Sequence, residues 1–292
     1  MPQSVLTRIS PARPYDLRTS AGGSAGGTRR WHGAAVVMAL PTAAGPARAA
    51  VRQRPDGDLE VAAAGPDAAA ALDAVRFALA TDVDHSEFLR MARRDPRMAP
   101  VSVRWSGFRP ARLGSVAHAV VAAACGQLVS GRQAAQMERA IVGMTGERVA
   151  DDLIASPSGR ALAGLQPARA VATGLAARRA SAMVRLARGA DLDGLRRAST
   201  GCMTARVVRE PWLGPWSAGV IGTYGLGRTD APMVGDLGLM RIVAAESGRW
   251  PEAGETLALV ERYGEWSGLA SAYLLRHPLA RVKQGTQPQR VA

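Results

Sequence analysis

The chain has 292 residues, which is enough for one or two domains with a sizeable core. Hydrophobic residues make up 47% of it but aromatic residues only 4%, so alanine, leucine and valine dominate, a composition that favours helices. The formal net charge of +13 indicates attraction to polyanions, with a nucleic-acid backbone as the first candidate. A GC-rich genome would explain the use of arginine but not its large excess over acidic residues.

Several kinds of site are disfavoured by residues that are scarce in the chain. Cys125 and Cys202 make neither a disulfide framework nor a four-cysteine iron–sulfur site, and their apolar helical surroundings predict two small core residues. Lys283 is the only lysine, so a buried lysine Schiff base has almost no candidate. The histidines, expected to be ordinary surface or half-buried residues without metal-ligand spacing, are at positions 32, 85, 118 and 277. We expect neither a metal site nor a cofactor.

The N-terminus has no basic-then-apolar signal pattern, and no run reaches the roughly 18 apolar residues of a membrane span. These observations predict a soluble, cytoplasmic protein with no membrane partner. We expect it to be a monomer.

The first part of the chain predicts a small β domain. Residues 1–10 are expected to be disordered, and the Gly/Ser cluster at residues 21–27 is expected to be a loop. An alanine-rich helix is expected over residues 67–79. Between them lie three β-like runs, which turn residues separate, at residues 33–40, 47–53 and 58–63. The sequence therefore predicts an antiparallel sheet that carries one helix, in a domain of residues 1–84.

Residues 85–292 predict an all-helical domain, which makes the fold class α+β. An amphipathic helix at residues 86–94 ends at Asp95-Pro96, and residues 97–112 are expected to be an irregular connector. From Ser115 onward the pattern is wholly helical. Helices are expected at residues 115–125, 132–142, 176–188, 192–198, 253–263 and 266–276, with further helix starts at Pro157 and Pro167.

The most informative stretch is residues 204–242. It predicts a short helix, a tight hairpin, a second helix, an irregular loop and an acidic residue that opens a third helix. In the hairpin, residues 210–215, Pro211 pre-sets one turn and Gly214 relaxes another. Pro215 suits the first turn of the next helix, because its missing N–H would have no partner there.

The start of that second helix offers a cradle for one backbone phosphate. The N–H groups of Trp216, Ser217 and Ala218 are unpaired there, at the positive end of the helix dipole. We therefore expect this helix start to contact a nucleic-acid backbone.

These residues resemble the helix-hairpin-helix superfamily of DNA glycosylases, which are base-excision enzymes. The family pattern L-P-G-[IV]-G-P-W-T-A, followed later by an aspartate, is matched here by Glu210-Pro211-Trp212-Leu213-Gly214-Pro215-Trp216-Ser217-Ala218 and by Asp236. The G-Q-L-V-S…A-A segment of bacterial 3-methyladenine DNA glycosylase II is similar to Gly126-Gln127-Leu128-Val129-Ser130 with Ala134-Ala135. The blocks fit in order and spacing across residues 85–276. The resemblance also implies a non-catalytic N-terminal β domain.

Asp236 is the catalytic residue that the resemblance implies. In the family this aspartate lies at a helix start and faces the extruded nucleotide. There a carboxylate stabilises the positive charge that builds on the sugar, and it can orient or deprotonate the attacking water. Without this context, an aspartate before an apolar helix is most often only an N-cap. The two roles are compatible, because a helix N-terminus favours the ionised form.

Trp216, Tyr224 and Tyr273 are the candidate base-pocket residues. Trp216 occupies the position at which lyase-type relatives hold a Schiff-base lysine, so the resemblance implies a monofunctional enzyme that leaves an abasic site. Its ring either stacks on a cationic base or packs the hairpin as a core residue. Val220 and Leu275 stand at positions that are often aromatic in the family's pocket, with the two tyrosines one helical turn away.

The candidate DNA-binding residues lie in two segments. In the hairpin region they are Trp212, Leu213, Gly214, Trp216, Ser217 and Ala218. The other segment, Gln127 and Leu128, resembles the one that enters the minor groove, where an apolar wedge fills the gap left by a flipped base; a leucine in an apolar run is otherwise a core residue.

Trp212 departs from the family pattern, because it replaces the first hairpin glycine. Tryptophan is costly where a positive φ is needed, so the turn can differ from that of the family. The sequence therefore does not decide whether the hairpin contacts a phosphate or binds a monovalent cation. Further candidates for phosphate contacts, each alone more typical of a solvated surface charge, are Arg132, Arg178, Arg179 and Arg206.

Together these features predict a monofunctional DNA glycosylase that removes alkylated purines of the 3-methyladenine type from duplex DNA, by base flipping and hydrolysis of the N-glycosidic bond. The alternative is a non-catalytic helix-hairpin-helix protein that makes sequence-independent DNA contacts. Both predict steep salt dependence of DNA binding, but only the enzyme predicts the loss of N3- or N7-alkylated purines. An oxidised-base or mismatch enzyme is disfavoured by the missing pocket lysine and iron–sulfur cysteines.

Overall fold

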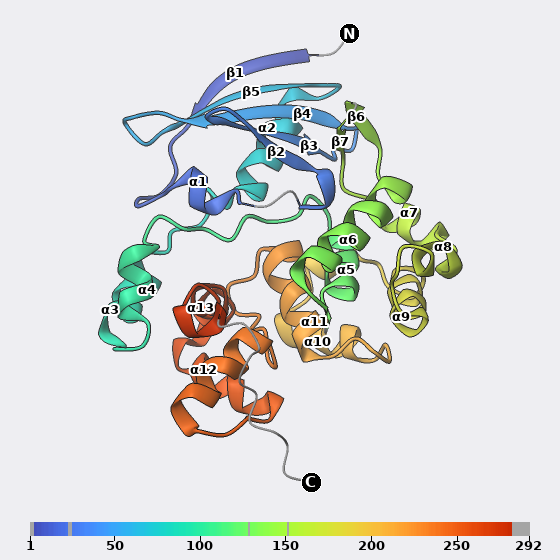
Figure 1. Ribbon diagram of the computed structural model, residues 1–292. Helices are drawn as coiled ribbons and strands as arrows, with labels where there is room; N and C mark the ends of the chain where they lie inside the picture. Colours follow the sequence, from blue (N-terminus) through green and yellow to red (C-terminus); the bar gives the residue numbers. More distant parts are fainter. Residues whose placement is uncertain (1–2, 23–24, 128, 151, 282–292) are drawn as a thin grey trace.

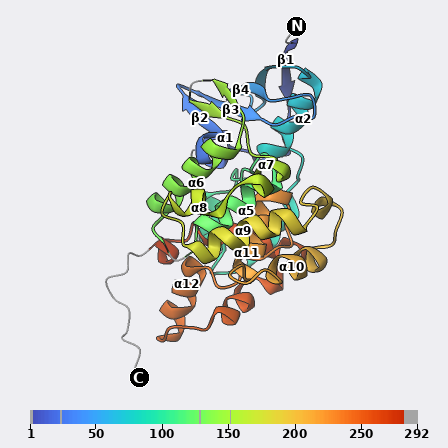
Figure 2. The same ribbon diagram turned by 90° about the vertical axis from the view of Figure 1, so that its right-hand side faces the viewer.

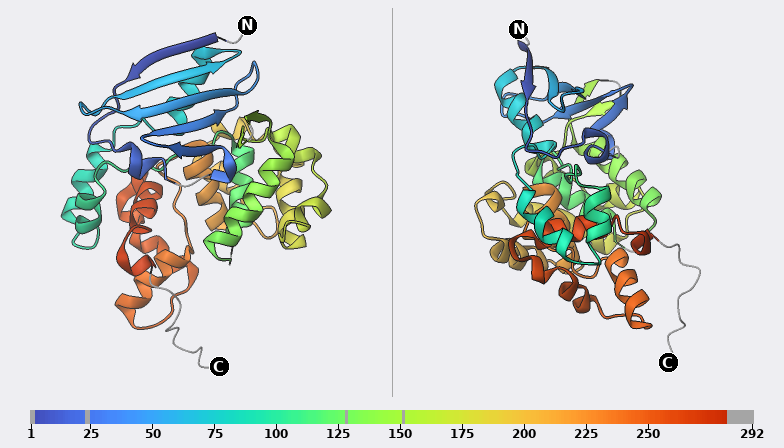
Figure 3. Two further views of the ribbon diagram at one scale, coloured as in Figure 1. Left: turned by 45° about the horizontal axis from the view of Figure 1, so that its top comes forward. Right: turned by 90° about the vertical axis from the view of Figure 1, so that its left-hand side faces the viewer.

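A five-stranded antiparallel sheet lies above a group of helices (Figure 1, Figure 2). The computed structural model describes residues 3–22, 25–127, 129–150 and 152–281. Figure 3 shows the five strands side by side, in the order β1-β5-β4-β3-β2. The strands are β1 (Gln3–Ile9), β2 (Arg29–His32), β3 (Ala35–Leu40), β4 (Ala47–Gln53) and β5 (Leu59–Gly65). The predicted α+β class, with the sheet first and a mostly helical region after it, is confirmed.

One face of the sheet packs against helix α2 (Ala68–Ala78), which explains the alternating pattern of the strands. In β5, Leu59 and Val61 are fully buried while Glu60 between them is not. Val75 of α2 is also fully buried and belongs to the same core. The helix begins at Asp67, whose carboxylate accepts a hydrogen bond from the Ala70 N–H at 2.9 Å.

Two of these strands were not predicted from the sequence. Residues 1–10 were expected to be disordered, but β1 pairs with β5 along its whole length. β2 has the sequence Arg-Arg-Trp-His and pairs with β3. Both strands are at the edges of the sheet and bury few apolar side chains of their own. They are ordered by backbone pairing, which leaves only a weak hydrophobic pattern in the sequence.

The helical part packs around its own core, with α5 at the centre. This helix is buried along almost its whole length and contacts α6, α9 and α11. The proposed domain boundary at residue 84 lies in the connection between α2 and α3. The helices of this part are α3 (Ser86–Arg94), α4 (Ala99–Arg104), α5 (Val116–Cys125), α6 (Gly131–Thr145), α7 (Gly159–Gly164), α8 (Pro167–Val171), α9 (Ala177–Gly189), α10 (Thr200–Val208), α11 (Pro215–Val220), α12 (Leu237–Ser247) and α13 (Ser267–Leu274).

The region after Ser115 was predicted to be wholly helical, and this prediction is wrong. A small hairpin of β6 (Arg148–Ala150) and β7 (Leu153–Ile154) interrupts it, because Leu153 packs against Val37 of the sheet. The expected irregular connector contains α4. The expected α-helix at residues 253–263 consists instead of 3₁₀ turns over Ala253–Leu259 and Glu261–Trp266.

The positions of Cys202 and His118 correct two further expectations. Cys125 is buried as predicted, but Cys202 is exposed, because it lies on the solvent side of α10. His118 is fully buried, whereas a surface or half-buried position was expected, and its two ring nitrogens lie 2.9 Å from Ser156 Oγ and from Glu138 Oε1. Within the described ranges no group of three His, Cys, Asp or Glu residues can hold a metal ion, and no helix is long and apolar enough to cross a membrane.

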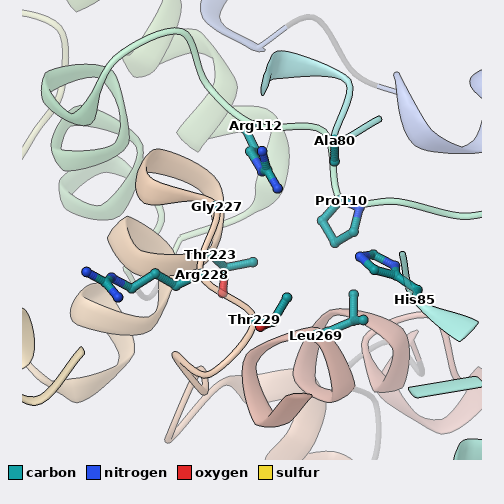
Figure 4. A pocket seen from close by; sticks show the side chains of 9 residues that line it. All are labelled: Ala80, His85, Pro110, Arg112, Thr223, Gly227, Arg228, Thr229 and Leu269. Carbon is teal, nitrogen blue, oxygen red and sulfur yellow. The ribbon is translucent and has the colours of Figure 1, made fainter. Parts of the chain in front are cut away.

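His85 is also buried, in a small cavity of about 20 Å³ (Figure 4). Its Nδ1 has no hydrogen-bond partner among the described residues. Burial, helped by the guanidinium groups of Arg109 and Arg112, lowers the pKa of His85 to about 2. The ring is therefore neutral in the folded protein at neutral and mildly acidic pH.

We predict that His85 makes the fold acid-sensitive. The unfolded chain takes up a proton at this ring below about pH 6.5 whereas the folded chain does not, so the free energy of unfolding falls as the pH drops below 6.5. The contribution reaches about 1.4 kcal/mol per pH unit, and chemical denaturation at pH 7.5, 6.0 and 5.0 measures it. His85→Gln is expected to lose this part of the slope. Exchange of the exposed His32 in the same way (His32→Gln) is expected to leave it intact; equal slopes in both variants would refute the assignment.

Candidate functional site

The predicted hairpin joins α10 to α11. Its turn is closed by a hydrogen bond of 3.0 Å from the Leu213 N–H to the Glu210 carbonyl, and Leu213 itself is buried. Gly214 precedes the first residue of α11, and Pro215 occupies that first position. The side chains of Leu213 and Ala218 point into the core, so only their backbone is available to a ligand.

Trp212 adopts a left-handed backbone conformation, with φ of +76°. This is the position at which the family pattern has glycine, and a non-glycine residue there is strained. The turn is held by Gln127, whose amide nitrogen donates to the Trp212 carbonyl at 2.8 Å and to Ser217 Oγ at 3.0 Å. The indole of Trp212 is 54% exposed and lies under the guanidinium of Arg178, 4.8 Å from the ring centre.

Asp236 lies directly before the first residue of α12, and both of its carboxylate oxygens are hydrogen-bonded. Oδ1 accepts from the Gly238 N–H at 2.7 Å, so the residue caps the helix. Oδ2 accepts from the indole N–H of Trp216 at 2.8 Å. The second bond connects the start of the hairpin helix α11 to the start of α12 and fixes the direction of the carboxylate.

Two glycines permit this close arrangement. A Cβ at Gly126 would lie 2.8 Å from the ring of Trp216, and a Cβ at Gly219 would lie 2.3 Å from the Pro232 carbonyl oxygen. Any larger residue would push α5 away from the indole, or α11 away from the loop that leads to Asp236.

Asp236 and Trp216 lie on the wall of a cavity of about 650 Å³, a volume typical of ligand sites. Gln127, Gly214 and Ser217 also line it, so the structure brings five predicted residues together there. Among the described residues that line the cavity, Asp236 is the only one with an ionisable side chain. The remaining wall is formed by Gly126, Pro215, Val234, Gly235, Leu237, Met240, Trp250, Ala253 and Gly254.

Trp250 was not selected from the sequence, although it lines the cavity and is half-buried. It follows Gly248, which ends α12 in a left-handed conformation, and it precedes Pro251. A tryptophan between two such turn residues, in a chain with 4% aromatic residues, is the signal that would have identified it.

The two predicted pocket tyrosines lie outside the cavity lining. Tyr273 is fully buried, donates to the Phe108 carbonyl at 2.9 Å and packs against Phe88. Tyr224 is half-buried in the π-helical turn Ile221–Leu226. Burial raises the pKa of each phenol to about 12, and the charge of Asp236 contributes at Tyr224. Leu128, the predicted wedge, lies outside the described residues.

The predicted phosphate-binding arginines differ in their surroundings. Arg132 and Arg178 are exposed. Arg179 donates to the Gln127 carbonyl at 2.6 Å, so it supports the residue that holds the hairpin. Arg206 lies 3.5 Å from Glu210 in an ion pair one helical turn apart.

No protein-family model and no curated protein matches this sequence. Solved structures do match it over almost the whole chain. The 3-methyladenine DNA-glycosylase from Archaeoglobus fulgidus superposes with a TM-score of 0.80 at 18% identity, covering 92% of this chain and 97% of that one. The chain has the fold of the helix-hairpin-helix DNA glycosylases.

A second group of structures shares this glycosylase fold. The 8-oxoguanine glycosylase/lyase of Clostridium acetobutylicum, in its apo form, superposes with a TM-score of 0.74 at 13% identity, covering 95% and 98% of the two chains. The same protein in complex with double-stranded DNA gives 0.71 at 14% identity, covering 92% and 96%. The glycosylase fold is thus shared with proteins of both substrate classes.

We predict that the strain at Trp212 is measurable. Trp212→Ala and Trp212→Gly both remove the indole, but only glycine relieves the left-handed backbone, which costs other residues about 1–2 kcal/mol. The glycine variant is therefore expected to be more stable than the alanine variant by about 1 kcal/mol in urea denaturation. In an ordinary helix or turn the order is the reverse, and that order here would show that the turn does not need a positive φ.

Proposed function

We propose that this protein is a monofunctional DNA glycosylase that removes alkylated purines from duplex DNA by hydrolysis of the N-glycosidic bond. The observation that carries the proposal is the carboxylate of Asp236, which lies on a cavity wall beside the helix start of the hairpin. A hairpin that holds one strand and a carboxylate directed at the cavity are the two parts that cleavage of a flipped nucleotide needs.

The proposed reaction starts with breakage of the bond between C1′ of the sugar and the base nitrogen, whose electron pair leaves with the base. A purine alkylated at N3 or N7 is cationic, so it departs neutral and needs no strong general acid. Positive charge develops on the sugar and is stabilised by the carboxylate of Asp236. Water then bonds to C1′ and loses a proton to Asp236 or to solvent, which leaves an abasic site.

The lining of the cavity favours alkylated over oxidised bases. Its walls are mostly apolar and include the indoles of Trp216 and Trp250, which attract a cationic ring by about 0.5–2 kcal/mol. An 8-oxoguanine base is neutral and would gain less. Trp216 also stands where lyase-type relatives hold their lysine, which supports hydrolysis without strand cleavage.

The match to a protein described as a 3-methyladenine DNA-glycosylase is consistent with this substrate class. A non-catalytic DNA-binding protein would use the same hairpin but would have no need for a carboxylate on the cavity wall. The proposal includes action as a monomer in the cytoplasm, with residues 1–84 as a domain that does not take part in catalysis.

Asp236→Asn is predicted to slow base release by two or more orders of magnitude while duplex binding persists, since a neutral amide cannot stabilise the sugar cation. Single-turnover release from alkylated DNA measures the rate, and fluorescence anisotropy measures the affinity. Asp230→Asn, at an exposed carboxylate that accepts from Thr200, is the matched control and is expected to keep the wild-type rate. Unchanged turnover in the Asp236 variant would remove this residue from the mechanism.

Trp216→Phe is predicted to reduce the single-turnover rate about tenfold with little change in DNA affinity. The variant keeps an aromatic ring on the cavity wall but removes the N–H that holds Oδ2 of Asp236, a bond to a charged group worth about 1.5–3 kcal/mol. Trp31→Phe on β2 is the control. A Trp216→Phe enzyme as fast as the wild type would show that the indole N–H does not position the carboxylate.

A further inference from the structure

The small cavity at His85 is separate from the cavity at Asp236. The described residues that line the two cavities have no member in common. Four segments meet at the small cavity: the α2–α3 connection with His85, the α4–α5 connection with Arg112, the chain after α11 with Gly227, and α13 with Leu269 (Figure 4). A ligand at this place would hold the four segments together without touching the proposed active site.

His85 brings an unpaired nitrogen to this cavity. The residue is 2% exposed, and its Nδ1 is buried with no hydrogen-bond partner in the part of the chain that the structure describes. In Figure 4 the ring points between Pro110 and Leu269, toward Thr229. A neutral imidazole that carries its proton on Nδ1 can donate there. Because a buried polar nitrogen without a partner costs free energy, an acceptor in the cavity is favoured.

The surroundings of the cavity are cationic. Its described lining includes the ionisable residues His85, Arg112 and Arg228 and no carboxylate. In Figure 4 the guanidinium of Arg112 points toward the cavity, whereas that of Arg228 points away. Burial is the largest cause of the low pKa of His85, and the charges of Arg109 and Arg112 are the next. Positive potential from these arginines therefore reaches the ring.

The guanidinium of Arg112 is held in a fixed position. It donates to the Phe77 carbonyl at 3.3 Å and pairs with Asp82 at 2.9 Å. A Cβ at Gly227 would lie 2.5 Å from its Nε, so the side chain packs directly against the turn after α11. Arg112 is 6% exposed, but the side chain of Asp82 is 45% exposed, so solvent screens the negative charge more than the positive one.

The size of the cavity limits what can bind. Its volume of about 20 Å³ exceeds the roughly 10–15 Å³ that one water molecule needs, and it is far too small for phosphate or sulfate. A water molecule would accept a hydrogen bond from His85 but would leave the charge of Arg112 uncompensated. A halide ion only accepts hydrogen bonds and also carries the opposite charge.

We propose that this cavity is a binding site for one halide ion, chloride in the cell, held by the Nδ1–H of His85 and by the charge of Arg112. Thr229 lines the same cavity and adds a hydroxyl that can donate. The ion stabilises the junction between the end of α2 and the chain after α11. It takes no part in base release, so the inference does not depend on the proposed function.

Thermal unfolding at pH 7.5 tests the site, in sodium chloride and in sodium gluconate of equal ionic strength. Gluconate is too large to enter the cavity. Wild type is expected to unfold about 3 °C higher in about 0.2 M chloride than in gluconate, since a ligand of the folded state raises the unfolding temperature. His85→Phe keeps an aromatic ring but has no nitrogen, and is expected to lose this difference. His32→Phe, at an exposed histidine, is the matched control and is expected to keep it.

Crystals grown in sodium bromide provide a second measurement, which needs no variant. Anomalous scattering at the bromine edge is expected to show one peak within hydrogen-bond distance of His85 Nδ1. A water molecule at that place in bromide would overturn the inference. So would a bromide peak without a chloride-dependent shift in unfolding temperature, which means binding at crystal concentration only. An equal shift in His85→Phe and wild type would overturn it as well.

Discussion

The site depends on the hydrogen bonds that hold both oxygens of Asp236. One comes from the Gly238 N–H at the start of α12, and the other comes from the indole of Trp216 at the start of α11. Each bond to a charged acceptor is worth about 1.5–3 kcal/mol, which is enough to keep the carboxylate in one orientation. Because Trp216 belongs to the hairpin helix, the same bond sets the distance between the hairpin and the carboxylate. A strand held by the hairpin would thus have one nucleotide in a fixed position relative to the acid.

The backbone of the hairpin is strained at Trp212. Trp212 adopts a conformation that suits glycine, and Gln127 stabilises it through the Trp212 carbonyl. Arg179 in turn holds the carbonyl of Gln127, so the chain after α5 forms a support for the turn. Strain of this kind persists where the surroundings over-determine it, and such positions cluster at functional sites. The exposed indole of Trp212 lies under the guanidinium of Arg178.

Much of the fold and part of the site could be predicted from the sequence. Strands β3, β4 and β5 show alternating or continuous apolar runs, and Asp236 was identifiable because the hairpin precedes it at the family spacing. β1 and β2 were not predictable, because their order comes from pairing with a neighbour distant in sequence. The cavity wall was also only partly predictable. Trp250 reaches the cavity from a turn after α12, whereas Tyr273 packs against Phe88 and Phe108 in the core. The direction of each side chain depends on tertiary packing, so the local sequence does not predict it.

Mass spectrometry of the bases released from methylated genomic DNA tests the central claim most directly, when it is combined with analysis of the strands that remain. The account predicts free N3- and N7-methylated purines, and strands that stay intact until alkali cleaves the abasic sites. No release above the protein-free control, or release accompanied by strand breakage, would contradict it.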